Sequence, residues 1–252
     1  MNTLIINFVL CFISFQPFAG TGNSVSSNSS PSDPKLILEG IQKFYTSHDY
    51  IYHELTYILY SEHSSTRPYS TEKGIFIKQG AIQYSQLASI ESLTTKDYTM
   101  GIDHDEKEIM ISNHISIPPT NPLAKVQDWI GDKSLVTIKP VSDHLSTLII
   151  KIVKGEIEES SLTYDIKTYE PVKLVMKYRR SIQLATDSES PLVQPRLEIE
   201  YNQTSLDGKG KERLNINAYL FKQGNSWKQA LKYKDYELIN NIHEFPESNK
   251  DH

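Results

Sequence analysis

The residues best suited to chemistry form a short polar run, Asp103-His104-Asp105-Glu106, between two apolar segments. Carboxylates and imidazoles are common metal ligands, so the composition alone is compatible with a metal site. The spacing argues against one, because neighbouring side chains diverge at a hairpin tip and the glycine of a calcium-binding loop is missing. We interpret the run as a solvated turn.

The other polar groups also lack catalytic spacing. His48 and His53 are separated by a predicted helix-to-strand boundary, so their rings need not face the same way. Glu158 and Glu159 are adjacent and point to opposite sides of a strand, unlike the paired carboxylates of a glycosidase. The glycine-dense piece 208–210 lacks P-loop spacing, and the sequence contains neither a Gly-x-Ser-x-Gly nor a His-Glu-x-x-His motif. The sequence therefore predicts a protein that is not an enzyme and has no catalytic residues, no metal site and no cofactor.

The amino terminus has the pattern of a secretory signal peptide, which we assign to residues 1–20. Its apolar stretch is too short to cross a bilayer and is followed by Pro17 and small residues. Residues 21–32 are rich in Ser and Asn, which predicts a flexible linker. We expect an exported protein, periplasmic or secreted, with no transmembrane span. Lipidation of Cys11, the only cysteine, would anchor it to a membrane, but no small residue precedes Cys11 as that signal requires.

The rest of the chain is expected to form one β-rich half-barrel domain, residues 33–243, followed by a polar tail, 244–252. Its charge gives little indication of a partner. The 26 basic and 31 acidic residues give a net charge of −5, and both signs are scattered along the chain. This pattern predicts no nucleic-acid partner, because nucleic-acid-binding proteins concentrate basic residues in a patch.

The elements that position these residues begin with one helix, capped by Asp33, opened by Pro34 and ending near Ser47. The segment Pro118 to Asp132 interrupts the strands, and within it Leu123, Val126, Gln127 and Ile130 have the spacing of a short second helix. Alternating apolar and polar residues predict many strands: 50–60, 74–78, 81–93, 98–102, 108–112, 134–140, 147–153, 160–165, 172–179, 196–203, 214–221 and 231–238. This order predicts a mainly β fold with few helices (α+β), an incomplete antiparallel β-barrel or strongly curved sheet closed by the two helices.

The predicted strands carry more apolar residues than one buried face requires, and a curved sheet would gather them around a cavity. Tyr and Met suit contact with a flexible apolar ligand, since one carries a polar tip and the other is unbranched. The predicted cavity-lining, ligand-binding residues are Leu55, Tyr57, Leu59, Phe76, Tyr84, Met100 and Met110. For each of them, a dry core against the helix is the alternative.

This order of elements resembles the periplasmic outer-membrane lipoprotein carrier (LolA/LolB-like) family, with this chain as a divergent member. The resemblance lies in Phe44-Tyr45 of the helix, in Gly74-Ile-Phe-Ile-Lys78, and in the segments 161–169 and 173–177. It implies an incomplete antiparallel barrel, closed by helices around an apolar cavity that receives lipoprotein acyl chains, with no enzyme chemistry.

We therefore expect an exported, non-catalytic binding protein that shelters an acyl chain or other apolar ligand in a half-barrel cavity, as a lipid or lipoprotein carrier does. Its expected partner is the apolar ligand or a lipoprotein acyl chain, and an envelope protein is a further candidate partner. The alternative is a structural or protein-interaction module of the cell envelope, with a filled core and no small-molecule ligand.

Overall fold

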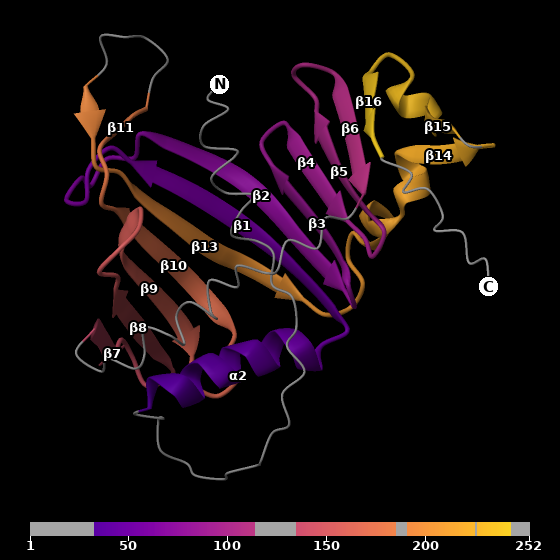
Figure 1. Ribbon diagram of the computed structural model, residues 1–252. Coiled ribbons are helices and arrows are strands. Elements are labelled where there is room, and N and C mark those ends of the chain that lie inside the picture. The colour runs from indigo at the N-terminus through magenta and orange to yellow at the C-terminus, as the bar shows by residue number, and fades with distance from the viewer. Residues whose placement is uncertain (1–32, 114–134, 185–190, 225, 243–252) are drawn as a thin grey trace, which may run out of the picture.

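The computed structural model describes residues 33–113, 135–184, 191–224 and 226–242. Within these ranges most of the chain is β-structure, and α2 (Pro34–Ser47) is the only α-helix (Figure 1). The strands of the main sheet are β1 (Tyr50–Tyr60), β2 (Ser70–Gln79), β3 (Ile82–Leu87), β4 (Ile90–Thr94), β5 (Tyr98–Asp103), β6 (Glu108–Asn113), β7 (Val136–Pro140), β8 (Leu145–Lys151), β9 (Ile157–Asp165), β10 (Pro171–Tyr178), β13 (Arg196–Ser205) and β16 (Glu237–Asn241). Two short ribbons pair β11 (Ile182–Gln183) with β12 (Leu192–Val193) and β14 (Leu220–Gln223) with β15 (Ser226–Gln229).

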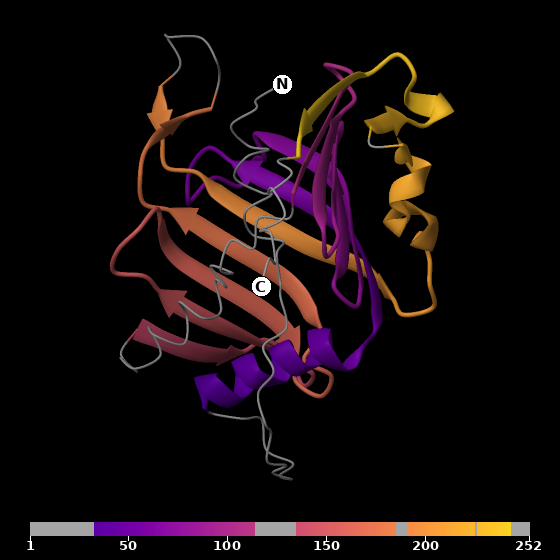
Figure 2. The ribbon, with the colours of Figure 1, turned by 45° about the vertical axis from the view of Figure 1, so that its right-hand side comes forward.

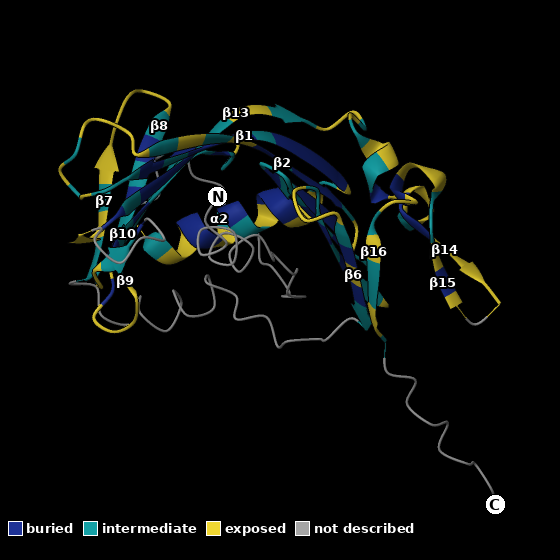
Figure 3. Cartoon of the chain, turned by 90° about the horizontal axis from the view of Figure 1, so that it is seen from above, coloured by how far each residue is buried: buried dark blue, intermediate teal, exposed yellow. Residues whose placement is uncertain are grey.

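The main sheet has twelve strands in the order β16-β6-β5-β4-β3-β2-β1-β13-β10-β9-β8-β7. All neighbours are antiparallel except β16 and β6, which are parallel. The sheet is strongly curved and does not close into a barrel, and α2 lies inside the curve, on the concave face (Figure 3). The predicted curved sheet is confirmed, with a parallel edge pair that the sequence did not indicate.

Helix α2 begins and ends where its sequence predicts. The Asp33 side chain accepts a hydrogen bond from the backbone N–H of Lys35 at 2.9 Å, and Pro34 occupies the first turn, where no N–H is required. The helix turns one apolar face to the sheet and buries Ile37, Leu38, Ile41, Phe44 and Tyr45.

Three of the predicted strands are wrong in extent. The segment 81–93 forms two strands, because the chain turns at Ala88, which has a φ of 51°. Residues 216–218 of the predicted strand 214–221 and residues 231–233 of 231–238 are instead 3₁₀ turns, η3 (Ile216–Ala218) and η4 (Leu231–Tyr233), which follow η2 (Lys211–Leu214). At η3 the Asn215 side chain accepts from the backbone N–H of Asn217, a local bond that competes with strand pairing.

Several predictions fall outside the described residues. These are the second helix at Pro118–Asp132, the signal peptide, the linker and the polar tail, so the domain boundaries remain predictions. In the described part of the chain, no helix has both the length and the apolar character needed to span a bilayer.

Candidate functional site

The strands on one side of β1 bury their concave face, and those on the other side bury their convex face. The change between the two occurs at β1. On the concave face, Ile51, Leu55 and Tyr57 of β1 belong to the core under α2. On the convex face, Tyr50 and Tyr52 belong to a second core under residues 206–224 and 226–242, which we call the C-terminal segment. Both faces of β1 are therefore buried, which explains why its sequence is apolar on both sides.

From β1 towards β7 the concave face is apolar on six adjacent strands, β1, β13, β10, β9, β8 and β7. Register places two rows of side chains across these strands. One row is Tyr57, Ile199, Leu174, Leu162, Leu148 and Ile138, and the next is Leu59, Leu197, Met176, Ser160, Ile150 and Val136. The convex face of the same strands is charged, with Lys173 2.6 Å from Glu198 and Lys177 2.7 Å from Glu159.

Helix α2 runs across one end of these strands (Figures 1 and 2). At its middle, Gly40 packs directly on the ring of Tyr169, in the turn between β9 and β10, and a Cβ at Gly40 would lie 2.4 Å from that ring. At its carboxyl end, the helix places Phe44 and Tyr45 over His53 of β1, with ring centroids 6.4 and 5.9 Å away. The helix is therefore docked by close contacts at both points.

His53 is fully buried between the helix and the sheet. Its ring also stacks on Phe76 at 6.2 Å and meets the edge of Tyr201 at 5.1 Å. Nδ1 lies 2.9 Å from the Thr204 hydroxyl, and Nε2 has no hydrogen-bond partner among the described residues. Burial lowers the pKa of His53 from 6.5 to about 4, so the ring is neutral at pH 7.

On the other half of the sheet, β3 to β6, the buried face is the convex one. The apolar side chains point to the convex face, where the C-terminal segment covers them with Leu214, Tyr219, Leu220, Trp227 and Tyr233. Their concave face carries small and polar side chains instead, among them Gln83, Ser85, Ser92 and Thr99.

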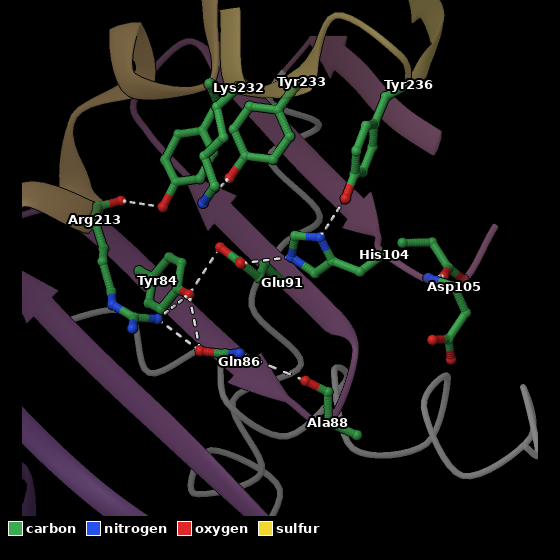
Figure 4. A network of polar contacts seen from close by, with 12 residues as sticks. Tyr84, Gln86, Ala88, Glu91, His104, Asp105, Arg213, Lys232, Tyr233 and Tyr236 are labelled. Carbon is green, nitrogen blue, oxygen red and sulfur yellow. Dashed lines mark hydrogen bonds and ion pairs between the residues drawn. The ribbon is translucent and has the colours of Figure 1, made fainter. Parts of the chain in front are cut away.

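A polar network fastens the C-terminal segment to β3 and β4 (Figure 4). Arg213 donates to the Tyr84 hydroxyl at 2.7 Å, and Tyr84 donates to the Glu91 carboxylate at 2.8 Å. The other Glu91 oxygen lies 2.7 Å from Nε2 of His104, whose Nδ1 lies 2.8 Å from the Tyr236 hydroxyl. Burial, with Glu91 close by, raises the pKa of Tyr84, so the phenol remains a donor to Glu91.

We expect Glu91→Gln to lower the free energy of unfolding by about 2 kcal/mol, because it removes a buried charged acceptor shared by Tyr84 and His104. Chemical denaturation followed by tryptophan fluorescence measures the loss, since Trp227 lies in the core that this network closes. Glu158→Gln, an exposed change on β9, is the control. Equal stability of the two variants would contradict the structural role assigned to the network.

The seven residues predicted to line a cavity are placed in different surroundings. Leu55, Tyr57 and Phe76 are buried in the core under α2, and Leu59 is buried further along β1. Tyr84 and Met100 lie on the convex face under the C-terminal segment, and Met110 is 47% exposed on the concave side of β6. The structure thus brings together Leu55, Tyr57 and Phe76, and ligand binding by all seven remains a prediction.

The histidines considered for metal binding are used structurally. Nδ1 of His48 lies 2.8 Å from the Phe44 carbonyl oxygen, and His53 is enclosed by rings. In the 103–106 turn, Asp103 accepts from the N–H groups of Asp105 and Glu106, whereas His104 points inward to Glu91. The turn is therefore less solvated than its composition indicates. Within the described ranges, no group of three His, Cys, Asp or Glu side chains is arranged to hold a metal.

Sequence reasoning missed Lys78, a lysine on the concave face that is only 4% exposed. Its Nζ lies 3.5 Å from the carbonyl oxygen of His48, directly after α2. Burial lowers its pKa, and the nearby charge of Asp49 opposes that change. The sequence did contain one indication of its burial. Lys78 comes two residues after Phe76, so both side chains lie on the same face of the strand, and this part of the strand is buried.

No protein-family model and no curated protein sequence matches the chain. Solved structures similar to it include an uncharacterised conserved protein from Thermus thermophilus, with a TM-score of 0.44, 7% identity, and coverage of 82% of this chain and 98% of that one. A candidate outer membrane lipoprotein-sorting protein domain from Vibrio parahaemolyticus has a TM-score of 0.32, 9% identity, and coverage of 72% and 97%. A LolA superfamily protein from Nitrosomonas europaea has a TM-score of 0.33, 8% identity, and coverage of 74% and 99%. The carrier family that the sequence resembles is represented among these structures.

Proposed function

We propose that this chain is an exported, non-catalytic binding protein that holds an acyl chain or other apolar ligand on the concave face of its sheet. The observation that supports this most strongly is the apolar concave face of six strands, which helix α2 crosses at one end. A role in carrying lipids or lipoproteins agrees with the resemblance to the carrier family.

The dimensions of the helix and the strands support the proposal. A helix of 14 residues is about 21 Å long and about 10 Å wide. It therefore covers most of the width of six strands, which is about 24 Å, but not their length. β1 has 11 residues and is about 36 Å long, so the face continues well past the helix.

The side chains beyond the helix have the character of a lipid-binding surface. Several apolar residues there are only half-buried: Val136, Ile138, Ile157, Leu162 and Leu174. Covering such side chains with an apolar ligand contributes about 25 cal/mol for each Å² removed from water. No charged side chain belongs to the two rows of this face, so a flexible hydrocarbon chain meets no unpaired charge there.

Two adjacent residues of β10 provide a matched test. Leu174 faces the concave side and Val175 the convex side, and both are half-buried. We expect Leu174→Glu to weaken binding of the neutral apolar probe N-phenylnaphthylamine about thirtyfold, because it places a carboxylate in the apolar face. Val175→Glu, which lies between Lys173 and Lys177, is expected to bind as the unmodified protein does. Fluorescence titration measures both affinities.

Solvent extraction of the purified protein followed by mass spectrometry identifies a ligand carried from the cell. The proposal fails if no lipid co-purifies and the unmodified protein shows no saturable binding of the probe. Equal binding by the Leu174 and Val175 variants would place the site elsewhere. Capture of an envelope protein without any lipid would favour the interaction-module alternative.

A further inference from the structure

A row of polar side chains crosses the concave face of β2 to β6 and β16 and ends at Lys78. In the register of the sheet, each residue of this row lies opposite the next on the neighbouring strand. Opposed residues are about 5 Å apart, so the row spans about 24 Å. Its members are Lys78, Gln83, Thr94, Thr99, Ser112 and Asn241.

Lys78 lies at the boundary between the polar row and the apolar face. Its strand partner on one side is Gln83, and on the other it is Ile51, in the core under α2. Within the described residues, its ammonium has one long hydrogen bond, to the His48 carbonyl, and no ion pair with a carboxylate. A buried ammonium with so few partners has lost hydration that an anion would replace.

The hydroxyl groups on the strands beyond Lys78 are also candidates for hydrogen bonds to a ligand. The side chains of Ser85, Ser92, Thr94 and Thr99 form no hydrogen bond with any part of the chain that is described. Between them and Met110 lies Gly101, where a Cβ would meet nothing within 4 Å. The concave face therefore has space beside Gly101, next to hydroxyl groups that have no partner in the described part of the chain.

We propose that the ligand is an anionic amphiphile, with its acyl chain on the apolar face of β1, β13 and β10 to β7 and its headgroup on the polar row. The anionic group pairs with Lys78, and the headgroup oxygens accept hydrogen bonds from the Thr94 and Thr99 hydroxyls. This inference rests on the proposed function and names its ligand class. A carboxylate and a phosphate both fit the chemistry of the site.

Two lipids with the same acyl chain test the inference. Lauroyl-lysophosphatidylglycerol is anionic, and lauroyl-lysophosphatidylcholine carries no net charge. Each is added below its micellar concentration to displace N-phenylnaphthylamine from the full-length protein. We expect the anionic lipid to bind about tenfold more tightly, as a charge-assisted contact predicts. Lys78→Met is expected to remove this preference by weakening the anionic lipid, and Lys78→Arg to keep it. Laurate against dodecanol then compares a carboxylate with a neutral head.

A double variant tests the hydroxyl groups without touching Lys78 or its contact with α2. Thr94→Val together with Thr99→Val keeps the shape of both side chains, and we expect it to weaken only the anionic lipid, about threefold. Thr71→Val, the same change on the convex face of β2, is the control.

The outcomes separate the two proposals. Binding of the probe with equal affinities for both lipids would overturn the anionic headgroup and leave the apolar site intact. A full preference in Lys78→Met, or one that is undiminished in the Thr94 and Thr99 variant, would overturn the assignment of these residues. Absence of any probe binding by the unmodified protein would overturn the proposed function itself. Loss of stability in Lys78→Met with unchanged lipid preference would show that Lys78 only caps α2.

Discussion

Lowering the pH from 6.5 to 4 is expected to cost this protein about 3 kcal/mol of unfolding free energy through His53 alone. In the folded state, burial among Phe44, Tyr45, Phe76 and Tyr201 holds the pKa of this imidazole at about 4. In the unfolded chain the ring takes up a proton near pH 6.5. The unfolded state therefore binds more protons throughout this interval, and stability falls as the pH falls.

His53→Gln removes the titrating group and keeps a side chain that can bond to Thr204. Urea denaturation at a series of pH values compares the two proteins. The difference in their unfolding free energies is expected to be constant above pH 6.5, to change by about 3 kcal/mol between pH 6.5 and 4, and to level off below. Parallel curves for the two proteins would show that His53 is hydrated or partnered when folded.

Gly40→Val is expected to lower the free energy of unfolding by about 3 kcal/mol, the upper part of the usual range for an overpacked core. The added Cβ would lie 2.4 Å from the Tyr169 ring, which stacks on Tyr164 and cannot move away freely. Valine is a somewhat better helix former than glycine, so a loss of stability identifies the contact with the sheet as its cause. Thermal and urea denaturation measure the effect.

A double-mutant cycle checks that Tyr169 is the obstacle. Tyr169 has a φ of 60°, which glycine adopts without strain, so Tyr169→Gly removes the ring at a suitable backbone position. In that background Gly40→Val is expected to cost less than 1 kcal/mol, that is, about a third of its effect alone. An unchanged cost would mean that α2 is docked by other contacts.

Local features of the fold could be predicted because their causes are local. Asp33 and Pro34 define the start of α2 through hydrogen bonding and a fixed φ, which neighbouring residues determine. The hairpin of β5 and β6 follows from alternation on both sides of a polar tip. The break at Ala88 was missed because alanine is uncommon at a positive φ and gives no turn signal.

The candidate site could be predicted only in part. Alternation shows that Phe76 and Tyr84 each lie on a buried face, but not that α2 covers one and the C-terminal segment the other. Lys78 was missed, and the burial of His53 was not predicted, for a related reason: both depend on residues that are distant in sequence. The signal peptide and the second helix remain sequence predictions.

The sequence by itself determined the class of the molecule: a β-rich chain with one amino-terminal helix and no recognisable catalytic motif. These properties depend on composition, capping and the two-residue period of a strand. Only the tertiary structure decided which face of each strand is apolar and that the change occurs at β1. The physical reason is that local alternation determines which residues share a face of a strand. Which segment packs on that face depends on contacts between residues distant in sequence. The short polar run at 103–106 illustrates this, because its one inward side chain, His104, is positioned by Glu91 and Tyr236.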